Sequence, residues 1–351
     1  MAVHLVLSVR CIHSARREKI MEIIQVNGLT KEYKLTKRNL GFWGAAKSFV
    51  KPEYETIKAV DNISFNIEKG KIVGFIGPNG AGKSTTIKMM VGILAPTCGN
   101  VKVNGFDSYR ERKKNAKSYG LVFGQRTQLW WDIPIFETFS LLKEMYSIED
   151  EVYKSNLEMF IEILNMKSFL NKPTRQLSLG QRMRADLCAA LLHNPEVLFL
   201  DEPTIGLDIS VKENIRKFIL EVNKERNTTI ILTTHDVSDI EQLSQEIMVI
   251  DVGRIIYRGN LVSLREVYGG KTVITIKADE SVMIDIAYDL DQYPLDISIE
   301  GDLSVEFDKN IIDSTSILNK IFSTHQIKGM KIEETPVEEI IKNIYRHELH
   351  V

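Results

Sequence analysis

The stretch Gly77-Pro78-Asn79-Gly80-Ala81-Gly82-Lys83-Ser84-Thr85 fits the phosphate-binding loop pattern G-x-x-x-x-G-K-[ST]. An apolar run over 72–76 predicts a buried strand before it, and apolar residues at helical spacing predict a helix over 84–93 after it. In this context the glycines let backbone N–H groups point at phosphate oxygens, and the start of the helix adds positive charge. We therefore expect Lys83 to reach the terminal phosphates of a nucleotide and Ser84 to ligate Mg²⁺.

Composition sets the class of protein. The chain has 351 residues, 44% of them hydrophobic, which predicts about two globular domains. Its net charge of −2 gives no general attraction to nucleic acid or anionic lipid. The cysteines Cys11, Cys98 and Cys188 lack metal-ligand spacing and fit a reducing compartment. No apolar run approaches the ~20 residues that cross a bilayer, so any role at a membrane requires a partner subunit.

The first residues of the chain make a poor signal peptide. A mildly apolar start over 1–9 has no basic region ahead of it and no small-residue cleavage site, and basic residues follow it. We expect a disordered leader over 1–20. The structured pattern begins at Met21, which is an alternative start of translation.

Polar side chains follow three apolar runs that read as strands. The run 119–123 ends before Gln125, the run 197–200 ends in Asp201 and Glu202, and the run 229–232 ends near His235. Parallel strands that deliver polar residues at their C-terminal ends are what an α/β sheet that handles phosphate needs. The sequence thus predicts an α/β sheet that handles phosphate around the phosphate-binding loop.

Two other regions are predicted from periodicity. Apolar residues at helical spacing over 153–164 and 183–191 indicate core-facing helices. After about residue 270, alternating strands and helices follow in the order βαββαβ, with a hairpin at Glu300-Gly301-Asp302 and a closing helix over 337–345. This order predicts a small α+β, ferredoxin-like domain over 270–351, in which we identify no catalytic constellation.

Five motifs in a fixed order carry a resemblance to a known family. They are the phosphate-binding loop, Gln125 after a strand, Leu177-Ser178-Leu179-Gly180-Gln181 opening a helix, Leu198-Phe199-Leu200-Asp201-Glu202-Pro203 with Gly206-Leu207-Asp208, and Thr234-His235-Asp236. Over about residues 22–265 the chain resembles the nucleotide-binding subunits of ABC transporters, most of all prokaryotic exporter-type subunits. The resemblance implies a P-loop NTPase fold with a mixed sheet and a helical subdomain over about 133–193.

The resemblance also implies roles for single residues. Asp201 would hold magnesium through water, and Glu202 would accept a proton from the attacking water. Gln125 would orient that water and ligate magnesium, while His235 would hydrogen-bond the γ-phosphate. A helix-start signal and a structural histidine are the plain alternatives for these residues, and the shared order of the motifs argues against both.

The stretch 177–181, which is the signature motif of the family, and the loop after Glu202 imply a dimer. In the family, residues at the positions of Ser178, Gly180 and Gln181 bind the γ-phosphate held by the other protomer, and Asp208 lies at the dimer interface. Leu179 departs from the family's usual glycine, which puts close packing or the rate of hydrolysis at this position in question.

Aromatic residues leave two choices open. An aromatic near the first strand stacks on adenine in this family, and the local sequence indicates Tyr33, whereas Tyr54 is closer in spacing to the phosphate-binding loop. Trp130 and Trp131 follow Gln125 in a region that touches the membrane subunit in the family; burial in the core is the alternative.

The resemblance therefore implies an ATP-hydrolysing subunit that binds two ATP and Mg²⁺ in a head-to-tail dimer with a second copy or a paralogue. It would drive a separate membrane-spanning permease, in the export direction, from the cytoplasmic face of the membrane, and no nucleic acid partner is expected. The alternative is a soluble ABC ATPase that acts on the ribosome or on DNA. The C-terminal domain is expected to have an accessory or regulatory role.

Overall fold

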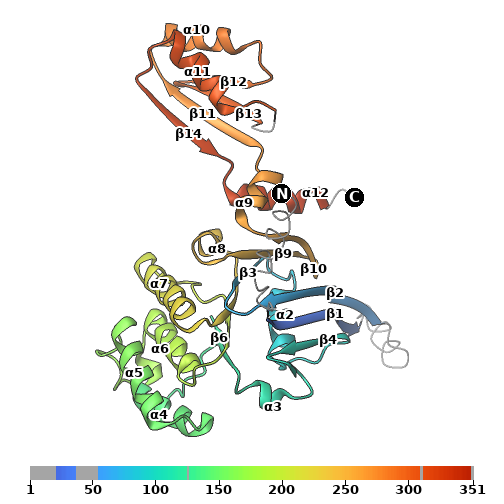
Figure 1. Cartoon of the computed structure of the whole chain (residues 1–351), viewed down its shortest axis with the longest axis vertical. Helices are drawn as coiled ribbons and strands as arrows, with labels where there is room; N and C mark the ends of the chain where they lie inside the picture. The colour runs from blue at the N-terminus through green and yellow to red at the C-terminus, as the bar shows by residue number, and fades with distance from the viewer. Residues whose placement is uncertain (1–20, 37–53, 125, 309–310, 349–351) are drawn as a thin grey trace, which may run out of the picture. The chain divides into compact units, whose positions relative to one another are not determined.

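The computed structural model describes residues 21–36, 54–124, 126–308 and 311–348. These residues form two compact units, which divide between Tyr257 and Arg258 (Figure 1). Each unit has a sheet and an apolar core of its own. The expected leader over 1–20 and Gln125 lie outside the described residues.

A six-stranded sheet with the order β10-β9-β3-β8-β7-β6 forms the centre of the first unit. All neighbouring strands from β9 to β6 run parallel, so their C-terminal ends meet at one edge. β3 and β8 are buried along their whole length, as expected for interior strands that are covered on both faces. The bounds are Ile72–Ile76 for β3, Tyr119–Phe123 for β6, Val197–Asp201 for β7, Thr229–Thr234 for β8, Glu246–Asp251 for β9 and Arg254–Gly259 for β10.

A second sheet of the first unit has the order β2-β1-β4-β5 and is antiparallel. Its strands are β1 (Glu22–Thr36), β2 (Tyr54–Glu68), β4 (Cys98–Val103) and β5 (Phe106–Asp107). The two sheets share one core, in which Phe65 of β2 lies edge-on to Phe75 of β3 with ring centroids 5.7 Å apart. This shared core fixes the phosphate-binding loop, which follows β3, against β2.

Helices of the first unit follow the strand ends. α2 (Lys83–Met90) continues from the phosphate-binding loop, and α3 (Arg112–Asn115) is one turn long. Between β6 and β7 lie α4 (Ile135–Tyr146), α5 (Asp150–Ile163), the 3₁₀ turn Thr174–Gln176 and α6 (Leu179–Leu191), which gather beside α7 (Ile209–Arg226) in Figure 1. Phe160 of α5 packs edge-on against Phe218 of α7, with centroids 5.5 Å apart. α8 (Val237–Leu243) follows β8.

The second unit is α+β. After α9 (Leu261–Tyr268) come β11 (Lys271–Lys277), α10 (Glu280–Leu290), β12 (Asp296–Glu300), β13 (Asp302–Asp308), α11 (Ser314–Thr324), β14 (Gly329–Glu334) and α12 (Val337–Glu348). The predicted element order βαββαβ is confirmed, and the antiparallel sheet has the order β12-β13-β11-β14. Alternate residues of β11 and β13 pack with α10 and α11 in one core.

Two boundaries differ from those inferred from sequence. β1 extends to Thr36 rather than ending near Val26, because register shifts in its pairing with β2 interrupt the alternation that marks a strand. α9 falls in the second unit, where its buried Leu264 lies near α12, whereas the sequence placed residues up to 265 in the first domain. β9, β10, α7 and α8 were not predicted as separate elements from periodicity.

Candidate active site

The phosphate-binding loop is held by two close backbone approaches that only glycine permits. A Cβ at Gly77 would lie 2.2 Å from the carbonyl oxygen of Ile250, at the end of β9. Gly82 has a φ of 106°, and a Cβ there would lie 2.4 Å from the carbonyl oxygen of Ala59 in β2. The phosphate-binding loop is thereby held between the two sheets. A residue larger than glycine at either position would clash with one of these carbonyl oxygens.

Lys83 begins α2 and is 5% exposed. Its ammonium donates hydrogen bonds to the carbonyl oxygens of Gly77, at 2.6 Å, and Pro78, at 3.1 Å. Burial lowers the pKa of Lys83, and the carboxylates of Glu202 and Asp201 partly offset that effect. Because Lys83 is buried, little water screens its ammonium group, which strengthens its attraction to phosphate.

The first carboxylate at a strand end is tied to the loop. Ser84 Oγ donates to Asp201 Oδ1 over 2.9 Å, which joins the first turn of α2 to the end of β7. Thr233 Oγ1 donates to the same oxygen over 2.5 Å, and it also accepts from the backbone N–H of Glu202 at 3.1 Å. Thr233 was missed from the sequence, although its place two residues before His235 at a strand end was a usable signal.

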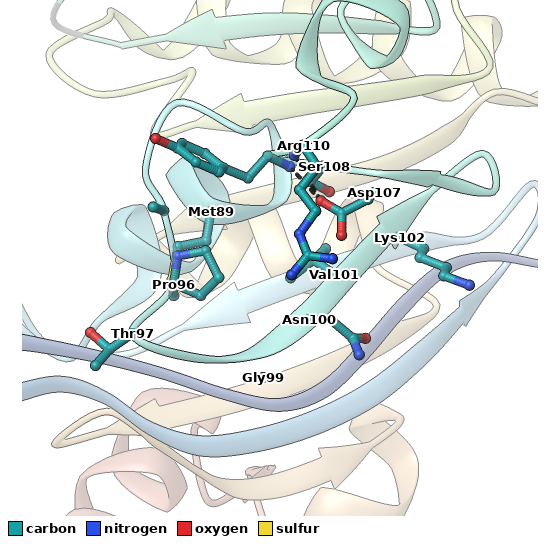
Figure 2. A pocket seen from close by; sticks show the side chains of 12 residues that line it. Met89, Pro96, Thr97, Gly99, Asn100, Val101, Lys102, Asp107, Ser108 and Arg110 are labelled. Atoms are coloured by element: carbon teal, nitrogen blue, oxygen red, sulfur yellow. Dashed lines mark hydrogen bonds between the residues drawn. The ribbon is translucent and has the colours of Figure 1, made fainter.

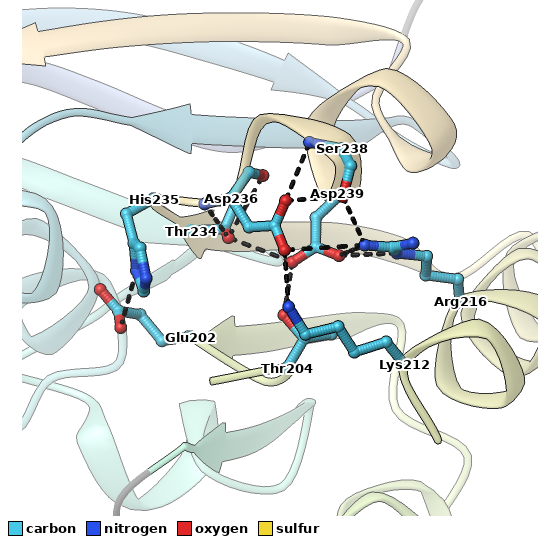
Figure 3. Close-up of polar contacts among 9 residues, drawn as sticks. All are labelled: Glu202, Thr204, Lys212, Arg216, Thr234, His235, Asp236, Ser238 and Asp239. Atoms are coloured by element: carbon cyan, nitrogen blue, oxygen red, sulfur yellow. Dashed lines mark hydrogen bonds and ion pairs between the residues drawn. The ribbon is translucent and has the colours of Figure 1, made fainter. Parts of the chain in front are cut away.

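The second carboxylate faces the histidine. Glu202 Oε2 lies 3.3 Å from His235 Nδ1, and Figure 3 shows the two side chains pointing toward one another. Glu202 has a φ of 56°, in the left-handed region, which costs on the order of 1 kcal/mol for a residue with a side chain. Such strain is concentrated at functional sites, and here it occurs where β7 ends.

A buried ion pair between α7 and α8 supports the loops that carry Glu202 and His235. Arg216 of α7 contacts Asp239 of α8 at 2.6 Å, and both side chains are nearly inaccessible. Asp239 also accepts from Thr234 at 3.1 Å and from Thr204, so it joins the end of β8 to the turn after Glu202 (Figure 3). These contacts fix the residues near His235 and Glu202, and no sequence motif predicted them.

Asp236, the residue after His235, is bound to α7, the helix that also carries Arg216. Its carboxylate pairs with Lys212 of α7 at 2.7 Å and accepts from Ser238. Burial would raise the pKa of Asp236, but the hydrogen bonds from Lys212 and Ser238 outweigh it and lower that pKa to about 2. Asp236 is therefore an ionised anchor at neutral pH.

A cavity of about 610 Å³ opens beside these residues. Its lining includes Asn79 and Ser84 of the loop, and Asp201, Glu202 and His235 of the strand ends. Figure 2 shows a different cavity, of about 580 Å³, beside β4, lined by residues such as Pro96, Asn100 and Arg110. No described candidate residue lines that second cavity, so the chemistry belongs to the first.

The signature motif lies at the start of α6, where Ser178 and Leu179 are exposed and Leu177 is buried. Ser178 caps the helix: it accepts from the Gln181 N–H at 3.3 Å, and the Gln181 side chain accepts from the Ser178 N–H at 3.0 Å. A Cβ on Gly180 would lie 3.1 Å from Val211 of α7. Ser178, Gly180 and Gln181 do not line the loop's own cavity.

The loop after Glu202 packs against the signature motif. The Leu179 side chain lies against Gly206, where a Cβ would be 3.2 Å from it. Asp208 is exposed at the N-cap of α7 and its side chain makes no capping hydrogen bond. Leu179, which stands where the family usually has glycine, thus contacts the loop after Glu202.

The remaining aromatic candidates are on the surface. Tyr33 pairs with Ile57 across β1 and β2, and Lys31 lies 5.3 Å above its ring, while Tyr54 pairs with Thr36. Both tyrosines are exposed, so burial does not choose between them. Trp130 and Trp131 are 40% and 50% exposed, and the alternative that placed them in the core is wrong.

One buried acid was missed entirely. Asp186 of α6 is 4% exposed and accepts hydrogen bonds from Thr127 and from the N–H of Gln128. It lies within the apolar stripe that predicted this helix, between Met183 and Leu187, and an acid inside such a stripe was a signal for a buried polar contact.

Comparison with known proteins agrees with this geometry. The family model described as ABC transporter matches residues 60–205. The ABC transporter ATP-binding protein NatA of Bacillus subtilis is 32% identical over 212 residues, which are 60% of this chain and 86% of that protein. The linearmycin resistance ATP-binding protein LnrL of Bacillus subtilis is 29% identical over 302 residues, 84% of this chain and 96% of that protein.

A solved structure shows the same fold. A dimeric, post-hydrolysis ATP-binding cassette bound to ADP and Pi is 25% identical, with a TM-score of 0.57, and covers 68% of this chain and 98% of the other. Among the described residues no helix is both long and apolar enough to cross a membrane. Ser84 of the phosphate-binding loop meets Asp201, Glu202 and His235 at one edge of a parallel sheet. Together with the order of the motifs and these similarities, this leads to one conclusion: the chain belongs to the ABC transporter family, as an ATP-binding subunit with ATPase activity.

Proposed function

We propose that ATP is hydrolysed at the strand-end cavity, with Lys83 on the phosphates, Glu202 as the base and His235 beside the γ-phosphate. The observation that carries this proposal is the pair of contacts Ser84–Asp201, at 2.9 Å, and Glu202–His235, at 3.3 Å, on the wall of one cavity. Two separate carboxylates beside one phosphate-binding loop allow one to bind cation and the other to take a proton.

The donor set also fits Mg²⁺. Ser84 offers a hydroxyl and Asp201 a carboxylate, and hard oxygen ligands of this kind are those that Mg²⁺ takes together with substrate phosphates and water. Bound there with ATP, Mg²⁺ would offset phosphate charge. Gln125, the further candidate ligand, lies outside the described residues.

The chain's residues divide the work of hydrolysis. Backbone N–H groups of the loop and Lys83 bind the β- and γ-phosphates and hold them in line for attack. As water oxygen bonds to the γ-phosphorus, its proton passes to the Glu202 carboxylate, the bond to the β-phosphate oxygen breaks, and ADP and phosphate form. His235 stabilises charge on the γ-phosphate, and the Arg216–Asp239 pair keeps its loop in place.

The exposed signature motif supports a composite site. Ser178 and Gly180 lie at the start of a helix yet stand outside their own chain's cavity, so a second chain is needed to bring them to a nucleotide. We call α6 the signature helix. In a head-to-tail dimer of two copies, or of this chain with a paralogue, the signature helix of each chain lies over the phosphate-binding loop of the other chain. Asp208 and Tyr33 are further candidates, at the dimer interface and on adenine.

A mixing experiment tests the composite site. Lys83→Ala removes the phosphate-binding lysine, and Ser178→Arg blocks the signature helix, so each purified variant alone should be inactive. An equal mixture contains heterodimers with one intact site, and turnover should return to about a quarter of the wild-type value. A mixture as inactive as its components would contradict the head-to-tail arrangement.

We further propose that the partner is a membrane-spanning permease and that transport is outward from the cytoplasmic face. Support comes from the exposed Trp130 and Trp131 and from similarity to a resistance protein. Tagged chain should co-purify with a protein of several apolar ~20-residue spans. Replacing both tryptophans with Ala should weaken that association, whereas Tyr288→Ala, at an exposed site of the second unit, should not.

No observation favours action on the ribosome or on DNA. The second unit has, we propose, an accessory role in regulation or dimer support, since the residues with candidate chemistry all lie in the first unit.

A further inference from the structure

The segment 127–132, which begins two residues after Gln125 in the sequence, is held by the buried Asp186 against α6, the signature helix. Asp186 Oδ1 accepts from Thr127 Oγ1 at 2.9 Å and from the Gln128 N–H at 3.0 Å. The Gln128 side chain in turn donates to the carbonyl oxygen of Asp186 at 3.0 Å. Three hydrogen bonds therefore join two consecutive residues of the segment to one residue of α6.

A second set of contacts holds the other end of the segment. Arg182 lies one turn before Asp186 on α6, and its guanidinium is 5.1 Å from the centre of the Trp131 ring. The Arg175 N–H donates to the carbonyl oxygen of Trp131 at 3.1 Å, and its side chain pairs with Asp132 at 3.1 Å. The segment is thus held at both ends by residues that lie in α6 or just before it.

The burial of the Asp186 carboxyl group indicates that these contacts serve to position the segment 127–132. Its neighbours Ala185 and Leu187 are buried, and an apolar residue at this position would avoid the cost of burying a carboxyl group. The carboxyl lines a cavity of about 360 Å³ together with Arg126, Tyr119 and Tyr146, and Arg182 faces it from its own helix. A buried polar group retained at such a cost serves to fix a particular arrangement.

We propose that Asp186 is a positioning residue that, with Arg182, locks the segment 127–132 onto the signature helix, so that the two move as one body. This inference rests on the proposed function for its meaning: the segment starts beside Gln125 and presents the tryptophans, while α6 starts at Ser178. A partner that displaces Trp130 or Trp131 would then also displace the signature motif.

Tryptophan fluorescence measures directly whether the segment 127–132 is held against α6. The chain has three tryptophans, and Trp43→Phe leaves Trp130 and Trp131 as the only emitters. In that background Asp186→Leu removes the acceptor, and acrylamide should quench emission about twofold more efficiently because the segment loosens. Asp186→Asn keeps an acceptor oxygen for both donors and should retain the unsubstituted quenching.

Two further variants keep the test decisive. Thr127→Val removes one hydrogen bond without altering the helix and should give an intermediate rise, which replaces the Leu result if that variant does not fold. Cys188→Ala changes another fully buried residue of α6 and should leave quenching unchanged. Equal quenching in Asp186→Leu, Thr127→Val and the unsubstituted background, or an equal rise in Cys188→Ala, would overturn the proposal.

Kinetics separate this proposal from the proposed function. Asp186→Leu should lower kcat about threefold or more and leave KM for ATP unchanged, because the segment beside Gln125 is displaced while the phosphate-binding loop is intact. If the unsubstituted protein hydrolyses no ATP, the proposed function fails while quenching still tests the lock. If it hydrolyses ATP and quenching is the same in all variants, only the lock fails.

Discussion

The six-stranded sheet of the first unit and the four-stranded sheet of the second use charged residues in opposite ways. Parallel strands bring the C-terminal ends of β3, β7 and β8 to one edge, where Ser84, Asp201 and Glu202 come within contact of one another or of His235. Antiparallel strands end alternately at opposite edges, and in the second unit charges pair across neighbouring strands, as Lys271 of β11 does with Glu306 of β13. Strand direction, rather than charge content, therefore makes the site.

The energetics of the two units differ accordingly. Exposed pairs such as Lys271–Glu306 contribute about 0–1 kcal/mol, because water screens them. The Arg216–Asp239 pair is excluded from water, and removing one partner leaves the other charge buried and unpaired. We therefore expect substitutions of charged residues to be severe in the first unit and mild in the second.

The largest contrast is expected for two lysines. Lys83→Ala removes the cation that binds the phosphates and should lower ATP turnover about 10²–10³-fold or more. Lys271→Ala, in the second unit, removes only an exposed pair and should leave turnover unchanged. Steady-state ATPase assays of both variants test this, and comparable turnover in the two would remove the distinction between the units.

A smaller contrast concerns stability. Asp239→Ala leaves Arg216 buried without its partner and should cost about 3–5 kcal/mol in the free energy of unfolding. Glu306→Ala breaks an exposed pair and should cost less than about 1 kcal/mol. Urea unfolding measures both, and similar losses would show that burial of the ion pair does not control stability.

The pH dependence of stability tests Asp186 through the difference between wild type and Asp186→Asn, because partly buried His193, with its pKa lowered to about 4, titrates over the same range. Burial raises the pKa of Asp186 from 3.8 to about 7, with hydrogen bonds from Gln128 and Thr127 acting in the other direction. The folded chain then binds a proton that the unfolded chain releases between about pH 4 and pH 7, so this group lowers stability as pH rises through that range. Asp186→Asn should flatten the loss of stability between pH 5 and pH 7.

Thermal unfolding across this range measures the effect. Asp236 has a pKa near 2, and its contribution is lost only as pH falls below about 4, so it does not interfere. An unchanged slope in Asp186→Asn would show that Asp186 does not take up the proton.

The smallest effect is expected from removing the second unit. A chain that ends at Gly259 retains β10 and omits α9, whose buried Leu264 belongs with α12. ATP affinity should stay within about twofold of the full chain, because no described residue of the second unit carries candidate chemistry. Isothermal titration tests this, and a folded truncated chain that does not bind ATP would place part of the site in the second unit.

Sequence alone predicted most of what lies at the strand ends. The strands at 72–76 and 119–123 were found to the residue, because strands that are mostly or fully buried appear as short apolar runs with polar residues after them. The βαββαβ order of the second unit was found because its sheet alternates regularly. Both successes rest on local pattern.

What the sequence did not predict depends on long-range packing. Thr233 and Asp239 act through contacts across 32 and 35 residues, to Asp201 and Thr204, and such partners have no local signature. The tryptophans were left open because composition cannot say which face of a loop meets solvent. Asp186 was hidden inside a stripe that was correctly assigned to the core.

The most direct test of the strand-end site is Glu202→Gln, which keeps the shape of the side chain but removes the proton acceptor. ATP affinity, steady-state turnover and particle mass would be measured beside wild type. We predict a fall in turnover on the order of 10²–10⁴, nearly unchanged affinity, and dimers that accumulate with ATP and Mg²⁺. Wild-type turnover, or loss of ATP binding by a folded variant, would contradict the assignment of Glu202 as the base.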